Sequence, residues 1–191
     1  MSNYLDSGHA RTHQDYYPTL KAKEMIRDLI SIAGIKIPTR VWEPHAGAGH
    51  LVEALQTLGR PVYASDIEPR ADGIHKLDFL AQKHLPTDDI RSIVMNPPFS
   101  TLDKQLQHAL SLMQPVRGKV LMLARTLLSS TEGRQTVFKN HPNFAAKIEM
   151  VSRPLWFEHN PKNAAIHPYS WYLWDFSTET DSPTIKWINP L

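Results

Sequence analysis

The residues of this chain best suited to chemistry are Asn96, Pro97, Pro98 and Phe99, which directly follow an apolar stretch typical of a buried strand. Because neither proline has an N–H group, the backbone there exposes carbonyl acceptors without a competing donor. The Asn96 side-chain oxygen and the Pro97 carbonyl would together accept both hydrogens of a planar NH2 group, such as adenine N6 or a glutamine amide. Holding these hydrogens out of the plane favours a tetrahedral nitrogen whose lone pair is directed at an electrophile. The Phe99 ring adds a flat face for a base, although an asparagine cap and a turn closed by a core phenylalanine would have the same sequence.

A glycine-containing turn follows an earlier apolar run and has the sequence Glu43-Pro44-His45-Ala46-Gly47-Ala48-Gly49. Glycines let the backbone turn tightly and approach a ligand, and a helix after them presents free N–H groups. Val52 stands where the dinucleotide fingerprint G-x-G-x-x-G has its third glycine, and the sequence has no phosphate loop. The acid before the glycines suits a ligand that contains an ammonium group. A tight strand-to-helix turn without a ligand is the alternative.

Two acidic positions farther along the chain suit a nucleoside. Asp66 ends a second apolar run, 19 positions beyond Gly47, and an acid at about that distance accepts both hydroxyls of a ribose. Asp78 would accept a hydrogen bond from the exocyclic amine of the base, and Phe79 would stack on the base. A helix cap or a surface acid explains Asp66 without a ligand, and a purely structural role is the alternative for Asp78.

The elements that must position these residues alternate between strands and helices. Apolar runs predict strands over residues 40–43, 61–65, 90–95 and 119–124, with a short strand near Leu77. Helical spacing predicts a first helix that is capped by Thr19 and ends before Gly34, and further helices over 50–58, 79–84, 102–113 and 131–139. Two β-rich runs over 147–157 and 170–177 predict an antiparallel hairpin. This order specifies an α/β fold with an open, mostly parallel sheet, helices on both faces and one reversed strand.

Length and composition favour one compact domain. The chain has 191 residues, no cysteine and a net charge of +2, from 21 basic and 19 acidic side chains. We expect a polar arm over residues 1–15 and a single domain over 16–191. The missing cysteines exclude a disulfide scaffold, a thiolate nucleophile and a cysteine-based metal site. The apolar stretches are too short to cross a bilayer, which predicts a soluble, cytoplasmic protein without membrane contact.

Other kinds of chemistry find little support in the sequence. His9 and His13 are four positions apart, but no HExxH motif or neighbouring acid accompanies them, so no metal site is expected. Ser129 and Ser130 lack the G-x-S-x-G surroundings of a hydrolase nucleophile. The modest net charge permits a nucleic-acid partner without arguing for one.

Taken together, the segment 43–49, Asp66, Asp78-Phe79 and the Asn-Pro-Pro-Phe motif resemble the ordered motifs of class I S-adenosylmethionine-dependent methyltransferases, in the amino-methylating group with [DNS]-P-P-[YFW]. Upstream, Tyr-Pro-Thr at 17–19 is similar to a segment of phage and prophage adenine methyltransferases, with Leu20 in place of the proline often seen next. The resemblance covers roughly residues 16–124 and implies a Rossmann-like, mostly parallel sheet of seven strands. The motif order resembles the gamma arrangement, and we expect no separate target-recognition domain.

The resemblance also implies roles for individual residues. The catalytic residues would be Asn96, Pro97, Pro98 and Phe99. The cofactor S-adenosyl-L-methionine would be bound by Tyr17, Thr19, Glu43, His45, Ala46, Gly47, Gly49, Asp66, Ile67, Asp78 and Phe79. An extruded target base would stack on an aromatic residue near the C-terminal hairpin, for which the candidates are Trp156, Phe157, Tyr169 and Trp171. Strand alternation buries about half of such residues, so a core position is the alternative for each.

These expectations favour an N-methyltransferase that acts on adenine N6, with nucleic acid, in particular DNA, as its partner. An RNA base amine and a protein glutamine amide fit the same two acceptors and stay open as substrates. Hypotheses from other classes are a catalytically inactive protein that binds S-adenosylmethionine or nucleic acid and a nicotinamide oxidoreductase. The intact motif at Asn96 argues against the former, and Val52 argues against the latter.

Overall fold

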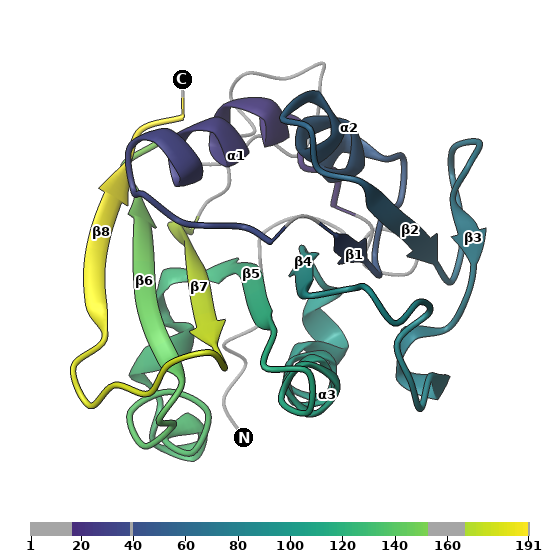
Figure 1. Cartoon of the computed structure of the whole chain (residues 1–191). Coiled ribbons are helices and arrows are strands. Elements are labelled where there is room, and N and C mark those ends of the chain that lie inside the picture. Colours follow the sequence, from purple (N-terminus) through teal and green to yellow (C-terminus); the bar gives the residue numbers. More distant parts are fainter. Residues whose placement is uncertain (1–16, 39, 153–166, 191) are drawn as a thin grey trace.

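The computed structural model describes residues 17–38, 40–152 and 167–190, which fold around one central sheet (Figure 1). Its strands are β1 (Val41–Glu43), β2 (Val62–Asp66), β3 (His75–Lys76), β4 (Ser92–Met95), β5 (Lys119–Arg125), β6 (Phe144–Met150), β7 (Tyr169–Asp175) and β8 (Thr184–Ile188). The α-helices are α1 (Ala22–Ser31), α2 (His50–Thr57) and α3 (Leu102–Met113). Short 3₁₀ segments are η2 (Phe79–Ala81), η3 (Phe99–Thr101), η4 (Thr126–Ser130) and η5 (Glu132–Arg134).

The strands of the sheet are ordered β3-β2-β1-β4-β5-β7-β6-β8, and among them only β7 runs opposite to the rest. This confirms the predicted α/β sheet, mostly parallel and with an antiparallel β6–β7 hairpin. The expected number of seven strands is too low, because β8 pairs in parallel with β6 and gives the sheet eight strands. Only Ile188 of the β8 residues is buried, so the strand lacks the apolar run from which the other strands were predicted.

The helices cover both faces of the sheet, with α1 and α2 on one side and α3 on the other (Figure 1). The side chains of β5 alternate between the two layers because successive residues of a strand point to opposite faces. Leu121 and Leu123 pack in the cluster that contains α1 and α2, whereas Val120 and Met122 pack in the cluster that contains α3. Two apolar cores therefore hold the central strands in place and fix the loops at their ends.

Three predicted helical features differ from the structure. Thr19 does not cap α1, whose N-cap residue is Lys21. The Thr19 hydroxyl instead accepts a hydrogen bond from Asn96. The prediction of a helix over 131–139 is wrong, because only η5 and turns form there. The Val137 carbonyl instead accepts a hydrogen bond from the indole N–H of the core residue Trp174 at 2.7 Å. The helix expected over 79–84 is shortened to the single 3₁₀ turn η2.

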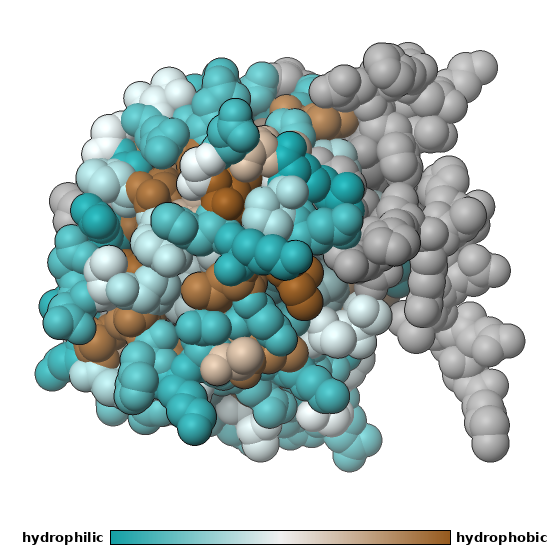
Figure 2. All heavy atoms as spheres, turned by 90° about the vertical axis from the view of Figure 1, so that its right-hand side faces the viewer, coloured by the Kyte–Doolittle hydropathy of each residue, from teal (hydrophilic) through white to brown (hydrophobic). Residues whose placement is uncertain are grey.

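Apolar residues are scattered over the surface on the side of β2 and β3, where Figure 2 shows them as separate patches between hydrophilic ones. On the edge strand β8, Ile185 and Trp187 are 58% and 61% exposed. Within the part of the chain that the structure describes, no helix combines the length and the hydropathy that crossing a membrane would require.

Candidate active site

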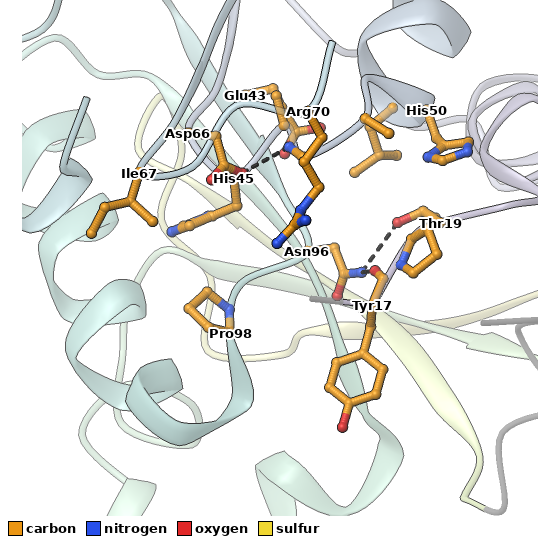
Figure 3. A pocket seen from close by; sticks show the side chains of 15 residues that line it. Tyr17, Thr19, Glu43, His45, His50, Asp66, Ile67, Arg70, Asn96 and Pro98 are labelled. Carbon is orange, nitrogen blue, oxygen red and sulfur yellow. Dashed lines mark hydrogen bonds between the residues drawn. The ribbon is translucent and has the colours of Figure 1, made fainter. Parts of the chain in front are cut away.

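A pocket lies where β1, β2 and β4 end, at the point where the strand order reverses (Figure 3). Ligands of open α/β sheets bind at this point, because the connections on either side of it diverge and leave a crevice. Its wall contains many of the residues selected from the sequence: Tyr17, Thr19, Glu43, His45, Ala46, Gly47, Asp66, Ile67, Asn96 and Pro98. The fold thus brings three sequence motifs and the segment before α1 to one space.

The loop after β1 takes its shape from Gly47 and Gly49, whose φ angles are 52° and 87°. Residues with a Cβ atom rarely adopt such angles. Asp66 at the end of β2 fixes this loop, because the Gly47 N–H donates to Asp66 Oδ2 at 2.7 Å. The other carboxylate oxygen, Oδ1, accepts from the Glu68 N–H at 2.8 Å. Each carboxylate oxygen keeps a second lone pair. Asp66 therefore anchors the loop, which the sequence did not predict, and still has acceptor capacity on the pocket wall.

Glu43 ends β1 with a carboxyl group that is almost entirely buried. The residue is 1% exposed, and its Oε1 atom has no hydrogen-bond partner among the described residues. Burial is the main cause that raises the pKa of Glu43 well above its ordinary value, the negative charge of Asp66 adds to it, and the backbone N–H of His45 opposes it. A buried carboxylate without a partner is costly. Glu43 is thus suited to a cationic hydrogen-bond donor that enters the pocket.

His45 lies on the floor of the pocket as a neutral imidazole. Burial lowers the pKa of His45 to about 4, against the opposing effects of Gln105 and Asp78. Its Nε2 atom is 3.0 Å from Gln105 Oε1, and its Nδ1 atom is buried without a partner in the described ranges. The pocket wall therefore contains, besides the carboxyl groups of Glu43 and Asp66, an imidazole nitrogen without a partner among the described residues.

Asn96 follows β4 and is oriented by the segment before α1. Its side-chain nitrogen donates to the Tyr17 carbonyl at 3.0 Å and to the Thr19 hydroxyl at 3.1 Å (Figure 3). Because a backbone carbonyl can only accept, the NH2 group of Asn96 must face Tyr17. Its Oδ1 atom is buried and has no partner among residues 17–38, 40–152 and 167–190. The amide thus presents a free acceptor beside the pocket.

The two prolines after Asn96 leave a second acceptor. Thr101 N–H donates to the Pro98 carbonyl at 3.3 Å, at the start of η3. In the described part of the chain, no recorded hydrogen bond ends on the Pro97 carbonyl. Neither member of the predicted acceptor pair, Asn96 Oδ1 and the Pro97 carbonyl, is therefore occupied by a donor from the described residues.

Phe99 lies in a cluster of aromatic and cationic side chains next to the pocket. Its ring stacks on Tyr17 with a centroid distance of 5.0 Å and an interplanar angle of 26°. The Tyr169 ring is tilted against it at 5.9 Å, and the Arg125 guanidinium carbon lies 5.9 Å from the ring centroid. The cluster brings an aromatic residue of β7 and a basic residue of β5 to the motif at Asn96.

The predicted adenine-binding residues do not line the pocket. Asp78 caps η2 and accepts from the Leu80 N–H at 3.0 Å. Phe79 is 3% exposed and packs edge to face on Trp42 at 5.0 Å and on His108 at 4.8 Å. Asp78 thus has a structural role as a cap, and the expected role of Phe79 is corrected to a core position.

The candidate base-stacking residues of the hairpin have different positions. Trp171 is fully buried in the core cluster with α1, so the structure corrects its expected role to a core position. Tyr169 is also buried, but its ring contacts Phe99. Trp156 and Phe157, like the arm over residues 1–15 with His9 and His13, lie outside the described residues.

Two further basic residues line the pocket, of which His50 was noted from the sequence only as flanking the glycine-containing turn and Arg70 was missed. His50 is the first residue of α2, and Arg70 follows β2 in the loop after Asp66. Figure 3 shows the Arg70 side chain directed into the pocket. The available signal was its position shortly after a strand end, where the sheet topology collects ligand-binding side chains. No group of three or more His, Asp and Glu side chains in the described ranges is placed to hold a metal ion.

No protein-family model matches the sequence, and no curated protein matches it. Among solved structures, the methyltransferase subunit of a type I restriction-modification system from Streptococcus thermophilus aligns with a TM-score of 0.56 and 12% identity over 97% of this chain and 50% of that chain. A proposed class I S-adenosylmethionine-dependent methyltransferase from Listeria monocytogenes aligns with a TM-score of 0.54 and 13% identity over 95% of this chain and 67% of that chain. A proposed RNA methyltransferase from Pyrococcus horikoshii aligns with a TM-score of 0.60 and 15% identity over 85% of this chain and 87% of that chain. At such identities the likeness concerns the fold, and the chain spans half the length of the restriction-modification subunit.

Proposed function

We propose that this chain is an S-adenosylmethionine-dependent N-methyltransferase and that its target is the N6 amine of adenine in DNA. The observation that carries the proposal is the Asn96 side chain, whose NH2 group is held by Tyr17 and Thr19 while its buried Oδ1 atom has no partner among the described residues. A buried acceptor of this kind is stabilised by a donor from outside the chain. An exocyclic amine next to an electrophilic methyl group meets that requirement.

The pocket residues fit the proposed cofactor. The unpaired Oε1 atom of Glu43 would accept from the ammonium group of the methionine end, and Asp66 would accept from the ribose hydroxyls. The positive φ angles of Gly47 and Gly49, which residues with a Cβ atom rarely adopt, set the path of the loop after β1, and Gly47 of this loop lines the pocket together with the two acids. Bound there, S-adenosylmethionine supplies a methyl group that is electrophilic because its sulfur is positively charged.

The motif at Asn96 would orient the attacking nitrogen. Asn96 Oδ1 and the Pro97 carbonyl accept one hydrogen each from the target amine, which favours a tetrahedral nitrogen with its lone pair directed at the methyl group. The bond between the methyl carbon and the sulfur would break as the new N–C bond forms, which leaves a neutral thioether and moves the positive charge to the nitrogen. No general base is required, because the charged nitrogen then releases one of its original hydrogens as a proton to water. The residues therefore act through position and electrostatics.

Several features favour a nucleic-acid base over a glutamine amide. Phe99 and Tyr169 provide aromatic rings beside the two acceptors, and extruded bases are held by stacking on such rings. The restriction-modification subunit among the structural neighbours agrees with a DNA substrate, whereas the proposed RNA methyltransferase agrees with an RNA amine. An RNA base amine is therefore the main competing substrate.

The proposal is tested by offering duplex DNA, single-stranded DNA, RNA and total protein to the purified chain with methyl-labelled S-adenosylmethionine, followed by analysis of the modified nucleosides and amino acids. We expect N6-methyladenine in DNA, with single-stranded or mismatched sites preferred because less stacking must be broken. Label only in protein, or only in RNA, would overturn the substrate assignment. Calorimetry that detects binding of NAD but not of S-adenosylmethionine would overturn the methyltransferase itself.

A further inference from the structure

Arg125 is a cation that lies beside the motif at Asn96 but outside the cofactor pocket. It is the last residue of β5, and its guanidinium carbon is 5.9 Å from the centroid of the Phe99 ring. We propose that Arg125 binds a phosphodiester group next to the target base and so makes a polynucleotide the substrate class of this enzyme. This inference rests on the proposed function, because it assumes that the target amine lies beside Phe99.

The guanidinium of Arg125 has no anionic partner within the described residues. Its recorded side-chain contacts are the Phe99 ring and the Tyr169 hydroxyl, both of which are neutral. Four other arginines of the described part are paired with acids, for example Arg134 with Asp103 at 2.6 and 2.9 Å. A guanidinium without a carboxylate, next to a predicted binding site, is available for an anion of the substrate.

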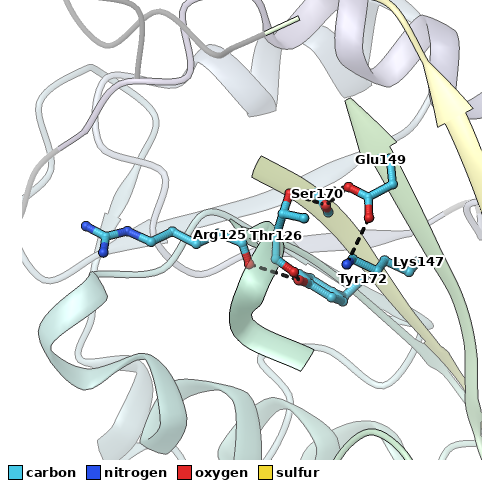
Figure 4. A network of polar contacts seen from close by, with 6 residues as sticks. All are labelled: Arg125, Thr126, Lys147, Glu149, Ser170 and Tyr172. Carbon is cyan, nitrogen blue, oxygen red and sulfur yellow. Dashed lines mark hydrogen bonds and ion pairs between the residues drawn. The ribbon is translucent and has the colours of Figure 1, made fainter. Parts of the chain in front are cut away.

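The backbone at Arg125 is held by a polar network from β6 and β7. The Tyr172 hydroxyl lies 2.8 Å from the carbonyl oxygens of both Arg125 and Thr126, and the Thr126 hydroxyl is 2.7 Å from Ser170 Oγ. Ser170 in turn donates to Glu149 at 2.6 Å. Figure 4 shows these groups on one side of Arg125, whose side chain extends away from them. The network therefore holds the backbone of Arg125 in place and makes no hydrogen bond to its guanidinium group.

The chemistry of the surroundings favours a phosphodiester as the anion. Proteins that bind unstacked nucleotides place aromatic rings against the bases and basic side chains against the phosphate groups of the nucleic acid. Phe99 and Tyr169 provide the rings, and the planar fork of Arg125 matches two phosphate oxygens. A protein glutamine, one of the two competing targets, has no phosphodiester that Arg125 could bind.

The test uses the variants Arg125→Gln and Arg125→Lys, with Arg91→Gln as the matched control. This control loses the same charge, but Arg91 precedes β4, at the opposite end of that strand from Asn96. Among the described residues, the Arg91 side chain donates hydrogen bonds to the Asp88 and Ile90 carbonyls. Binding of a labelled, adenine-containing single-stranded 20-nucleotide DNA is measured by anisotropy between about 50 and 200 mM salt. The dependence of transfer rate on DNA concentration and the affinity for S-adenosylmethionine are measured in parallel.

We expect Arg125→Gln to raise KM for DNA about tenfold with a smaller change in kcat, and to lower the slope of log Kd against log salt by about 0.7, the value for one phosphate contact to a single strand. Arg125→Lys retains the slope because it retains the charge. Arg91→Gln behaves as the wild type, and cofactor affinity is unchanged in all three variants.

An Arg125→Gln protein with the salt slope and KM of Arg91→Gln would overturn the inference. If the wild type still produces N6-methyladenine in that case, the proposed function stands and only the role of Arg125 fails. If the wild type instead labels protein alone and binds DNA without salt dependence, both the substrate assignment and the role of Arg125 fail.

Discussion

The side-chain nitrogen of Asn96 lies 3.1 Å from the Thr19 hydroxyl, a contact between the motif after β4 and the segment before α1. Together with the Tyr17 carbonyl, Thr19 occupies the donor end of the Asn96 amide and leaves Oδ1 free. Residues separated by 77 positions in the chain thus determine which end of the amide faces the substrate. Thr19 is in this view a positioning residue for Asn96.

Replacing Thr19→Val keeps the shape of the side chain but removes the oxygen that accepts from Asn96. We expect kcat to fall about tenfold, because the amide is then held at one point only and its oxygen is less well directed. Thr19→Ser keeps the hydroxyl and is the matched control, in which kcat should stay near that of the wild type. Steady-state kinetics of methyl transfer measure both. Equal kcat values for the valine and serine variants would show that the contact has no role in catalysis.

Asp66→Ala should weaken the affinity for S-adenosylmethionine by about 1.5 to 3 kcal/mol, if the carboxylate accepts charge-assisted bonds from the ribose. Calorimetry measures this affinity. The thermal midpoint should fall as well, because the Gly47 and Glu68 N–H groups lose their acceptor. Asp72→Ala removes an exposed acid of the same loop and serves as the control. An Asp66→Ala protein with unchanged affinity would mean that the ribose binds elsewhere.

Glu43 should make cofactor binding depend on pH. Because burial and Asp66 raise the pKa of Glu43 above its ordinary value of 4.5, the empty protein keeps this group protonated to a higher pH than the unfolded chain does. A bound ammonium group favours the carboxylate, so affinity should increase as the pH rises through this raised pKa. Glu43→Gln should abolish the increase, and calorimetry over a pH series tests this. A wild-type affinity that is constant with pH would contradict the assignment of Glu43 to the ammonium group.

The Glu43 carboxyl group should have the opposite effect on the stability of the empty protein, which should decrease as the pH rises. A raised pKa in the folded state means that the free energy of unfolding decreases as the pH rises from about 4.5 through the raised value, since the unfolded chain releases the proton more easily. Without cofactor, Glu43→Gln should therefore raise the thermal midpoint at neutral pH. A lower midpoint for the glutamine variant would mean that the empty protein stabilises the carboxylate.

Gly118→Ala should destabilise the protein by about 1 to 3 kcal/mol, because a Cβ atom there would lie 2.7 Å from Met113 Sδ and 2.9 Å from the Arg91 carbonyl oxygen. Gly118 precedes β5, so this tests the packing that supports the strand ending at Arg125. Gly133→Ala is the control, because nothing lies within 4 Å of its added Cβ atom. Urea unfolding compares the two variants. Equal unfolding midpoints would contradict the tight contact.

Much of the fold could be predicted from the sequence, because its central elements have strong patterns. The helix over 102–113 was predicted with the bounds that α3 has, and the apolar runs before Glu43, Asp66 and Asn96 form β1, β2 and β4. Such runs mark strands that are buried on both faces. The edge strand β8 is largely exposed and lacks this pattern. Gly133 and the β-branched residues Thr131, Thr136 and Val137 weaken the helix expected over 131–139.

The site could be predicted only in part, for a related reason. The positions after buried strands were found because the topology of an open sheet collects its strand ends at one edge. Sequence spacing does not show in which direction a side chain points. It therefore could not show that Asp66 lines the pocket whereas Phe79 is buried in the core. The orientation of the Asn96 amide depends on Tyr17 and Thr19, a contact that only the folded chain forms.

The most direct test of the proposed chemistry is the comparison of kcat with cofactor affinity in Asn96→Ala. This variant removes one of the two acceptors for the target amine and leaves Glu43 and Asp66 in place, so we predict that kcat falls by about 10² or more while the Kd for S-adenosylmethionine changes little. Methyl transfer near the wild-type rate by Asn96→Ala would contradict the central role of its free oxygen.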